Sequence, residues 1–467
     1  MKSSSGRHLI FKYFGIAMAA ISLAFSYIFH IEGLSEQAMH TMGVLAGTMF
    51  LFVFESFPVS ISCLISSVLL FVCECVGSIT EAFSGFSNHI LYFTIASFGL
   101  SLAFQKSVLS RKILSMMLRW GNPGVRGLTF LFMLCAAALS SIMSNVAAVV
   151  IFLPYAEQFL AYIKEEERKK SRRGIYICIT VSALIGGMIT PAGSSMNLIC
   201  VDMLETYAGV QVRFIDWVII GLPLAFVMII AAFFIITTVY PPAEPAEEEM
   251  SRYLEDARKA RAASFMDIYV GILIAAIVST WIISSWIPAI HVTAVSVAGL
   301  AMMFLPGIQI MTWGEFCSSI SWPTFFIAGN LISISEAVTA TGLCEYFTEI
   351  LFAYMSGQAE WLLVAQIAVI TFLFMAFLPS APAVISILSP IIIRFAQEKD
   401  VNPVMLLMAS ALCVSNIYLF PLDAPLAVAY DRKAFRMFEL PRATIWIQMF
   451  MVIAVSVWIP LVFHFVY

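Results

Sequence analysis

Apolar residues fill long stretches of this chain, and several stretches are interrupted near the middle by short polar segments. A run of about 20 apolar residues is long enough to cross a bilayer as a helix. The first run, residues 9–30, has no small-residue cleavage site after it, so we expect a retained span and not a signal peptide. Glycines, prolines and charges are distributed as in bundled helices, without the alternation of a β-barrel. The pattern predicts an all-α polytopic membrane protein with about 11 spans.

One uncharged run, residues 127–156, carries four polar residues near its middle: Ser140, Ser141, Ser144 and Asn145. Basic clusters flank it on both sides, and such clusters favour the cytoplasm. A single crossing would place one flank outside, whereas two half-helices of about 15 residues that meet at Ser144 and Asn145 keep both inside. We therefore expect a re-entrant hairpin. Taken alone, a Ser-Asn pair in an apolar helix more often bonds back to its own helix turn or holds neighbouring helices together.

A second uncharged run, residues 361–393, also breaks in its middle, within the segment LPSAP. Its flanks have no basic excess, so this hairpin should enter from outside. Ser144 aligns with Ser380 and Pro154 with Pro390, without gaps and at a constant offset of 236 residues. The repeat weakens the simpler interpretations of the first break, because helix contacts alone do not require matched positions.

Each hairpin is followed by an interrupted helix. Residues 189–197 read ITPAGSSMN and match residues 419–427, LFPLDAPLA. Pro191 and Pro421, taken alone, would be compatible with simple kinks. Interrupted helices at membrane depth expose N–H groups that attract anions and carbonyl groups that bind Na⁺. Two inverted halves, each with a hairpin and a broken helix, indicate a secondary transporter whose site lies at the midplane.

Composition supports this class and charge sets an orientation. The chain is 61% hydrophobic and 12% charged, with a mean hydropathy of +0.94, which excludes an ordinary soluble protein. Basic residues gather in five clusters: residues 2–12, 111–126, 164–173, 252–261 and 432–442. These should be cytoplasmic, so we expect a plasma (inner) membrane protein with its N-terminus in the cytoplasm and its C-terminus outside. Nine single cysteines indicate core residues and neither disulfides nor a metal site.

Two acidic residues stand out. Asp423 follows an uncharged run, residues 401–422, and an acid at membrane depth is expensive enough to indicate function, such as binding of Na⁺, a proton or a substrate cation. Alternatively, the helix ends early and Asp423 is a cytoplasmic cap before Arg432. Glu336, within LISISEAVTATG, could equally face solvent or a neighbouring helix.

Five segments together resemble the divalent anion/Na⁺ symporter family, the di- and tricarboxylate and sulfate transporters of the wider ion-transporter superfamily. They are residues 54–65 (FESFPVSISCLI), 144–154 (SNVAAVVIFLP), 189–197, 291–307 and 320–343. The resemblance covers nearly the whole chain. It implies a homodimer of the elevator type.

The resemblance also implies a division into domains. Residues 1–120 and 264–350 would supply scaffold and dimerisation helices. Residues 121–240 and 351–467 would form the transport domain, each with a hairpin, a broken helix and a following helix. Residues 241–263 would be a solvated cytoplasmic linker between the two halves.

Carried over residue by residue, the resemblance implies a first Na⁺ site made of Ser140, Ser144, Asn145 and Gly193. It implies a substrate site made of Ser144, Asn145, Val146, Ser194, Ser380, Ala381, Pro382, Ala424 and Pro425.

This chain departs from the family pattern in places. Val146 stands where the family has Thr, and Ala381 and Pro382 follow Ser380 where it has Asn and Thr. Asp423 replaces a small residue near the usual second Na⁺ site, so we expect it to form an altered cation or proton site.

The predicted function is secondary active transport of a small divalent anion, such as succinate, malate or citrate, with Na⁺ coupling. The alternative is a proton-coupled or exchange transporter of another cargo in the superfamily, such as a Na⁺/H⁺ antiporter or an oxyanion exporter. An intramembrane enzyme is not expected, because HExxH, GxSxG and P-loop motifs are missing. A channel is disfavoured by the inverted repeat. The expected partners are the anion, Na⁺ or H⁺ and the lipid bilayer, with no cofactor and no nucleic acid.

Overall fold

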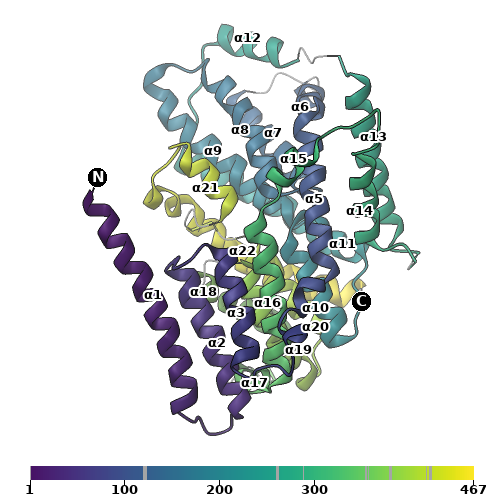
Figure 1. Ribbon diagram of the computed structural model, residues 1–467. Helices are drawn as coiled ribbons and strands as arrows, with labels where there is room; N and C mark the ends of the chain where they lie inside the picture. The colour runs from purple at the N-terminus through teal and green to yellow at the C-terminus, as the bar shows by residue number, and fades with distance from the viewer. Residues whose placement is uncertain are drawn as a thin grey trace. The chain divides into compact units, whose positions relative to one another are not determined.

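The structure is a computed structural model that describes residues 2–118, 124–258, 262–287, 289–352, 355, 357–377, 381–416, 418–419 and 423–466. These residues form α-helices and short 3₁₀ turns, with no β-strand among them (Figure 1). The predicted all-α fold is confirmed.

Five of the described helices are long and apolar enough to span a membrane: Leu9–Ile28, Phe214–Val239, Phe265–Ile283, Ala381–Glu398 and Pro441–Phe465. A bent pair, Trp322–Ala340 with Leu343–Ile350, meets the same criterion when taken together, with an angle of 82° between its parts. The protein is therefore an integral membrane protein. The total of about 11 spans stays a prediction.

Helix starts follow from local sequence. The side chain of Ser35 accepts a hydrogen bond from the N–H of Ala38 and caps α2 (Glu36–Val53). Ser264 and Asp267 form a reciprocal capping box at the start of α13 (Phe265–Ile283).

The contacts divide the chain into two compact units, and each unit draws on both halves of the sequence. Unit 1 comprises Met1–Tyr92, Ile199–Gln211 and Ser321–Val414. Unit 2 comprises Phe93–Leu198, Val212–Ile320 and Ser415–Tyr467. The predicted division into scaffold and transport domains is a functional one and stays a prediction.

Unit 1 is built from helices of the chain's start and of its second half. They are α1 (Lys2–Ile28), α2, α3 (Val59–Val72), α4 (Ile79–Ala82), η1 (Ser84–Ser87), α16 (Trp322–Ala340), α17 (Leu343–Phe352), α18 (Glu360–Phe377), α19 (Ala381–Glu398) and α20 (Pro403–Val414). Helix α1 packs along α2, and α3 packs against α16 (Figure 1). A buried amide joins the second pair, because Asn330 Nδ2 donates to Ser67 Oγ at 2.9 Å.

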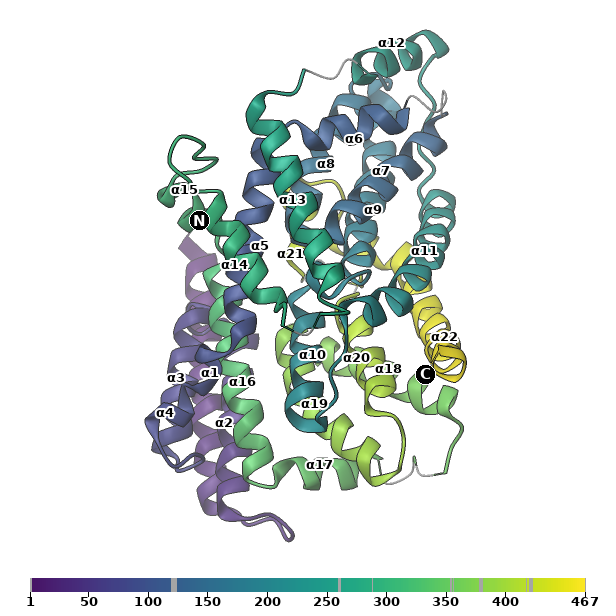
Figure 2. The same cartoon turned by 90° about the vertical axis from the view of Figure 1, so that its right-hand side faces the viewer.

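Unit 2 holds the first hairpin and both helix interruptions. Its elements are α6 (Leu109–Leu118), α7 (Val125–Ser140), α8 (Asn145–Leu160), α9 (Glu165–Gly187), η2 (Pro191–Gly193), α11 (Phe214–Val239), α12 (Glu247–Arg258), α13, α14 (Val292–Met302), α15 (Trp313–Ser319), α21 (Ala424–Asp431), η3 (Met437–Glu439) and α22 (Pro441–Val466). Helices α5 (His89–Lys106) and α10 (Ser195–Ala208) run from one unit into the other. Helices α7 and α8 pack on α9, as Figure 2 shows.

The first hairpin has the predicted break, whereas residues 378–380, where the second break is predicted, lie outside the described residues. Helix α7 ends at Ser140 and α8 begins at Asn145, while α18 ends at Phe377 and α19 begins at Ala381. Asn145 and Ala381 are separated by the predicted offset of 236 residues. Ser380, the predicted start of the second tip, lies outside the described residues.

Both helix interruptions are also confirmed. Helix α9 ends at Gly187, and α10 begins at Ser195 after the short turn η2. Helix α20 ends at Val414, and the next helix, α21, begins only at Ala424. Pro421, which the sequence placed in this second interruption, lies outside the described residues.

Two adjacent glycines bring the first hairpin against α9. A Cβ added at Gly186 would lie 2.4 Å from the carbonyl oxygen of Ala137 on α7. A Cβ added at Gly187 would lie 2.5 Å from Asn145 Oδ1 at the start of α8. Such small residues allow helix backbones to approach closely in membranes. They bring the hairpin tip and the end of α9 into direct contact.

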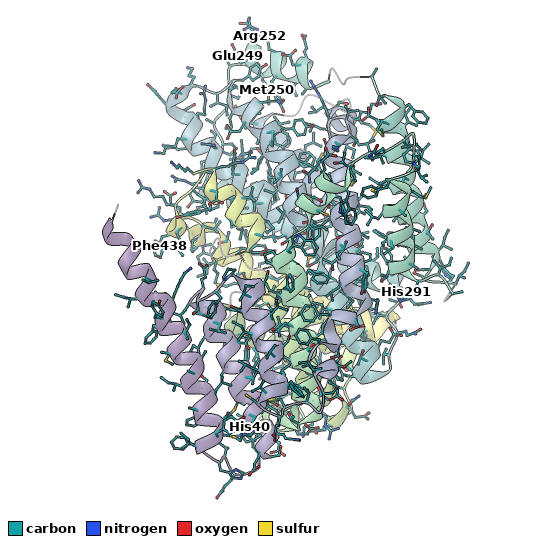
Figure 3. The ribbon with its side chains drawn as sticks, viewed as in Figure 1. His40, Glu249, Met250, Arg252, His291 and Phe438 are labelled. Atoms are coloured by element: carbon teal, nitrogen blue, oxygen red, sulfur yellow. The ribbon has the colours of Figure 1, made fainter. Side chains whose placement is uncertain are left out.

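The connection between the two halves is more than a solvated linker, because α12 is an amphipathic helix packed on α6. Tyr253 and Leu254 are each 4% exposed, and the Tyr253 ring lies 5.2 Å from the ring of Phe159 on α8. Figure 3 labels Glu249 and Arg252 on the same helix, where Arg252 Nη1 pairs with Glu249 Oε1 at 3.3 Å. The charged side chains thus occupy the exposed face of α12, and Tyr253 and Leu254 occupy its packed face.

Candidate functional site

The first hairpin tip is held by hydrogen bonds between its own polar side chains. Ser140 is fully buried, and its Oγ donates to Asn145 Oδ1 at 2.6 Å. Asn145 Nδ2 makes no hydrogen bond within the described residues, so it can donate to a ligand. The N–H of Ser144 donates to Ser101 Oγ at 3.3 Å. The tip therefore fixes one end of the Asn145 amide and leaves the other available.

The interruption after α9 is tied to this tip. Thr190 Oγ1 donates to the carbonyl of Ser141 and accepts from the N–H of Gly193 at 3.0 Å. Asn197 is fully buried, and its Nδ2 donates at 2.8 Å to the carbonyls of both Gly187 and Thr190. These bonds satisfy backbone groups that the broken helix leaves without helical partners.

Three of the four residues predicted to bind Na⁺ meet around Gly187. A Cβ added at Gly187 would lie 2.5 Å from Asn145 Oδ1, the atom that accepts from Ser140, and a Cβ added at Gly193 would lie 2.6 Å from the Gly187 carbonyl oxygen. Ser144 stands next to this group, at the N-cap position of α8. Within the described residues no three His, Cys, Asp or Glu side chains cluster as for a metal ion. The oxygens gathered here are neutral, as suits a weakly bound monovalent cation.

Predicted substrate residues lie at two half-helix starts. Ser144, Asn145 and Val146 open α8, and Ser194 precedes α10; all four are half-buried. Ser144 forms no side-chain cap on α8, so the first N–H groups of that helix are available to a ligand. Helix N-termini attract anions through these N–H groups and the helix dipole. The arrangement can hold a carboxylate without a basic side chain.

Four other predicted substrate residues lie at the starts of α21 and α19. Ala424 is exposed and Pro425 buried at the start of α21, which packs against α8 and α9 in unit 2. Ala381 and Pro382 are half-buried at the start of α19 in unit 1.

Asp423 caps α21. Its side chain accepts the N–H of Ala424 at 3.0 Å, and its carbonyl accepts the N–H of Ala427 at 2.9 Å. An acid at this position is favoured by the N-terminal end of the helix dipole. The helix-cap interpretation from the sequence therefore has a structural basis, and a role in cation binding stays a prediction. Glu336, on α16, is exposed and accepts a hydrogen bond from Ser84 Oγ of η1.

Sequence reasoning missed a polar group behind the second interruption. Tyr418 and Asn416 are fully buried, and Tyr418 Oη donates to Asn416 Oδ1 at 2.7 Å. Gln448 of α22 donates to the carbonyl of Asn416 at 3.2 Å and accepts the N–H of Tyr418 at 3.3 Å. The available signal was one amide side chain within the otherwise apolar part of α22.

Apolar helices with polar interruptions, and half-helix starts that gather hydroxyl and amide groups, define a membrane transporter. A model of the family described as the sodium:sulfate symporter transmembrane region matches residues 10–465. The chain belongs to this family, which confirms the resemblance seen in the sequence and the expectation that the protein is not an enzyme.

Curated relatives are also transporters. The L-tartrate/succinate antiporters of Escherichia coli strain K12 and of Shigella sonnei strain Ss046 are each 22% identical over 380 residues, which cover 79% of this chain and 76% of theirs. Among solved structures, the crystal structure of the Alcanivorax borkumensis YdaH transporter, which is described as having an unusual topology, matches with a TM-score of 0.54 and 13% identity. That match covers 97% of this chain and 98% of the other, and it supports the fold alone.

Proposed function

We propose that this protein is a secondary active transporter that moves a small dicarboxylate across the membrane together with Na⁺. The observation that carries the proposal is the first hairpin tip, where half-buried groups at the start of α8 stand directly beside the neutral oxygens around Gly187. Family membership supports an anionic cargo, and the names of the relatives favour a C4-dicarboxylate such as succinate or tartrate.

The substrate carboxylate would be held by neutral donors. The N–H groups at the start of α8 and the Asn145 amide nitrogen would bind one carboxylate, with Ser194 beside them. The family resemblance assigns Ser380, Ala381, Pro382, Ala424 and Pro425 to the substrate as well. Because none of these residues is charged, binding is weak enough for release on the other side of the membrane.

Asn145 would couple the two ligands. Its Oδ1 faces Ser140 and the predicted Na⁺ site, while its Nδ2 is left for the substrate. A cation that binds Oδ1 polarises the amide and fixes its orientation, which strengthens the hydrogen bond that Nδ2 donates. Substrate binding is then favoured when Na⁺ is present.

The larger-scale parts of the proposal follow the family resemblance. The protein would work as a homodimer, with an elevator movement of the transport domain and with its N-terminus in the cytoplasm. Asp423 would contribute an altered cation or proton site beside its cap role.

A second candidate is obligate exchange. It is favoured by one observation, that the curated relatives are antiporters of tartrate and succinate. In this mode the inward and outward steps would both require bound dicarboxylate, and Na⁺ would serve only to order the tip.

Reconstituted liposomes separate the two modes. Uptake of labelled succinate would be measured with an inward Na⁺ gradient, with an inward H⁺ gradient, or with succinate loaded inside. Uptake driven by Na⁺ alone is the expected result, and Asn145→Ala should abolish it. Uptake that requires internal succinate would replace symport with exchange, and no uptake of succinate or tartrate under any condition would contradict dicarboxylate transport.

A further inference from the structure

Three side-chain oxygens from both helix interruptions converge in unit 2. Ser415, just after the end of α20, places its Oγ 3.4 Å from Ser194 Oγ and 3.5 Å from Asn197 Oδ1. Hydrogen bonds between oxygens are usually 2.5–3.0 Å long, so these contacts are long for hydrogen bonds. Oxygens that bind one hard cation at about 2.3–2.6 Å, at right angles to each other, are about 3.3–3.7 Å apart. The spacing therefore matches shared cation ligands better than mutual hydrogen bonds.

The three oxygens are held in place by their surroundings. Asn197 is fully buried and both carbonyls that it binds accept from its Nδ2, so its Oδ1 is the atom that faces Ser415. Ser194 Oγ accepts the N–H of Met196 at 3.3 Å, which orients the hydroxyl. Ser415 is 6% exposed, whereas Ser194 is half-buried and gives the group one accessible side.

Charge around the group favours a monovalent cation. The carbonyl ends of α9 and α20 lie at Gly187 and Val414, and helix C-termini carry partial negative charge. None of the three oxygen-bearing residues bonds to a Lys, Arg or His of the described part of the chain. Since no carboxylate takes part, a divalent ion would be poorly compensated for the water that it loses.

We propose that Ser194, Asn197 and Ser415 form a binding site for a monovalent cation of the size of Na⁺, distinct from the site predicted at Ser140 and Asn145. The inference rests on the proposed cation-coupled transport. A cation here joins the interruption after α9 to the interruption after α20. It also fixes Ser194, a predicted substrate contact, so that cation binding prepares both broken helices for the anion.

A Na⁺ titration of thermal stability tests the site without transport. The melting temperature of the purified full-length protein would be measured in detergent without any carboxylate. Choline would be replaced stepwise by Na⁺ at constant ionic strength. A ligand that binds the folded state raises the melting temperature. In choline, Ser415→Ala should melt at the same temperature as the wild type. The Na⁺ concentration at the midpoint of its titration should be at least fivefold higher than that of the wild type. Ser194→Ala should shift the midpoint in the same direction.

Three further variants serve as comparisons. Ser456→Ala removes a buried hydroxyl of α22 that donates to the carbonyl of Val452 at 2.6 Å, and it should leave the titration unchanged. Ser415→Thr keeps the oxygen and should retain Na⁺ binding. Ser140→Ala alters the other predicted site, and its combination with Ser415→Ala should remove the Na⁺ response.

Several outcomes would overturn the inference. One is a Ser415→Ala titration identical to the wild type while Ser140→Ala shifts it. Another is a Ser415→Thr response as weak as that of Ser415→Ala. A wild type that does not respond to Na⁺ would also overturn it, and succinate uptake against internal succinate would then show that dicarboxylate transport itself stands.

Discussion

The two helix interruptions of unit 2 are stabilised in different ways. After α9, residues of the same repeat satisfy the free backbone groups, with Asn197 bound to two carbonyls and Thr190 bound to the hairpin tip. After α20, the backbone is held by Gln448, which lies on the last helix of the chain. The first interruption is therefore stabilised by side chains of its own repeat, and the second by a side chain of α22.

This difference shows how an internal repeat can keep its geometry while its sequence changes. The second repeat has Ala427 at the position that corresponds to Asn197, so the amide that braces the first interruption has no counterpart there. An amide from another helix takes over the backbone hydrogen bonds. A loss of one polar residue in a membrane interior is tolerated only when another group satisfies the same backbone atoms.

The largest effect is expected for Asn197→Ala. It leaves the buried carbonyl of Gly187 without its donor, at about 1–3 kcal/mol, and removes one of the two hydrogen bonds to the carbonyl of Thr190, at about 1 kcal/mol, so the free energy of unfolding should fall by about 2–4 kcal/mol. Thermal unfolding in detergent measures the loss. Gln211→Ala, which loses one exposed hydrogen bond to Glu205 Oε1, is the control. Equal melting temperatures for the two variants would show that the first interruption is not braced by Asn197.

Gly187→Ala should come next, because its Cβ would lie 2.5 Å from Asn145 Oδ1. Overpacking of this kind costs about 1–3 kcal/mol and should displace the Asn145 amide. We expect succinate uptake in liposomes to fall at least tenfold. Gly314→Ala, where an added Cβ meets nothing within 4 Å, should transport normally. Normal uptake by Gly187→Ala would show that the hairpin tip is not part of the transport site.

Gln448→Met tests the bracing of the second interruption. It removes the bonds to the carbonyl of Asn416 and the N–H of Tyr418, with an expected loss of about 1–2 kcal/mol in the free energy of unfolding. The control is Gln397→Met, an exposed residue of unit 1 whose one hydrogen bond goes to the carbonyl of Tyr207. If both variants melt alike, α22 does not support the second interruption.

Asp423→Asn should change stability least. Asparagine caps helices about as well as aspartate, so the free energy of unfolding should stay within about 0.5 kcal/mol, whereas Asp423→Ala should lose about 1 kcal/mol. The dependence of succinate uptake on pH should change in both variants, because neither retains a carboxylate. An unchanged pH profile together with unchanged rates in Asp423→Asn would limit this residue to its cap role.

Much of the fold could be predicted because polar residues in apolar runs mark helix ends. Ser144 and Asn145 predicted the first break, and α8 begins at Asn145. That this hairpin enters and leaves the membrane on one side stays a prediction. The offset of 236 residues matches Asn145, the first residue of α8, with Ala381, the first described residue of α19.

The bracing contacts could not be predicted, since they depend on which helices become neighbours. Gln448 is one amide in an apolar helix, a pattern compatible with many roles. Gly187 is one of 24 glycines, and its contact with Asn145 joins positions on separate helices. The linker helix α12 was expected to be solvated because its sequence is rich in charge, yet Tyr253 and Leu254 pack one face of it.

The contact between Gly186 and Ala137 has a practical consequence for spectroscopy. With no side chain between the two backbones, α7 and α9 cannot slide or separate without losing the packing of both. A pair of labels on their outer faces would therefore report one constant distance throughout the working cycle. That pair provides a reference distance. If it stays constant while the distance from α9 to a third helix changes, the movement belongs to the third helix.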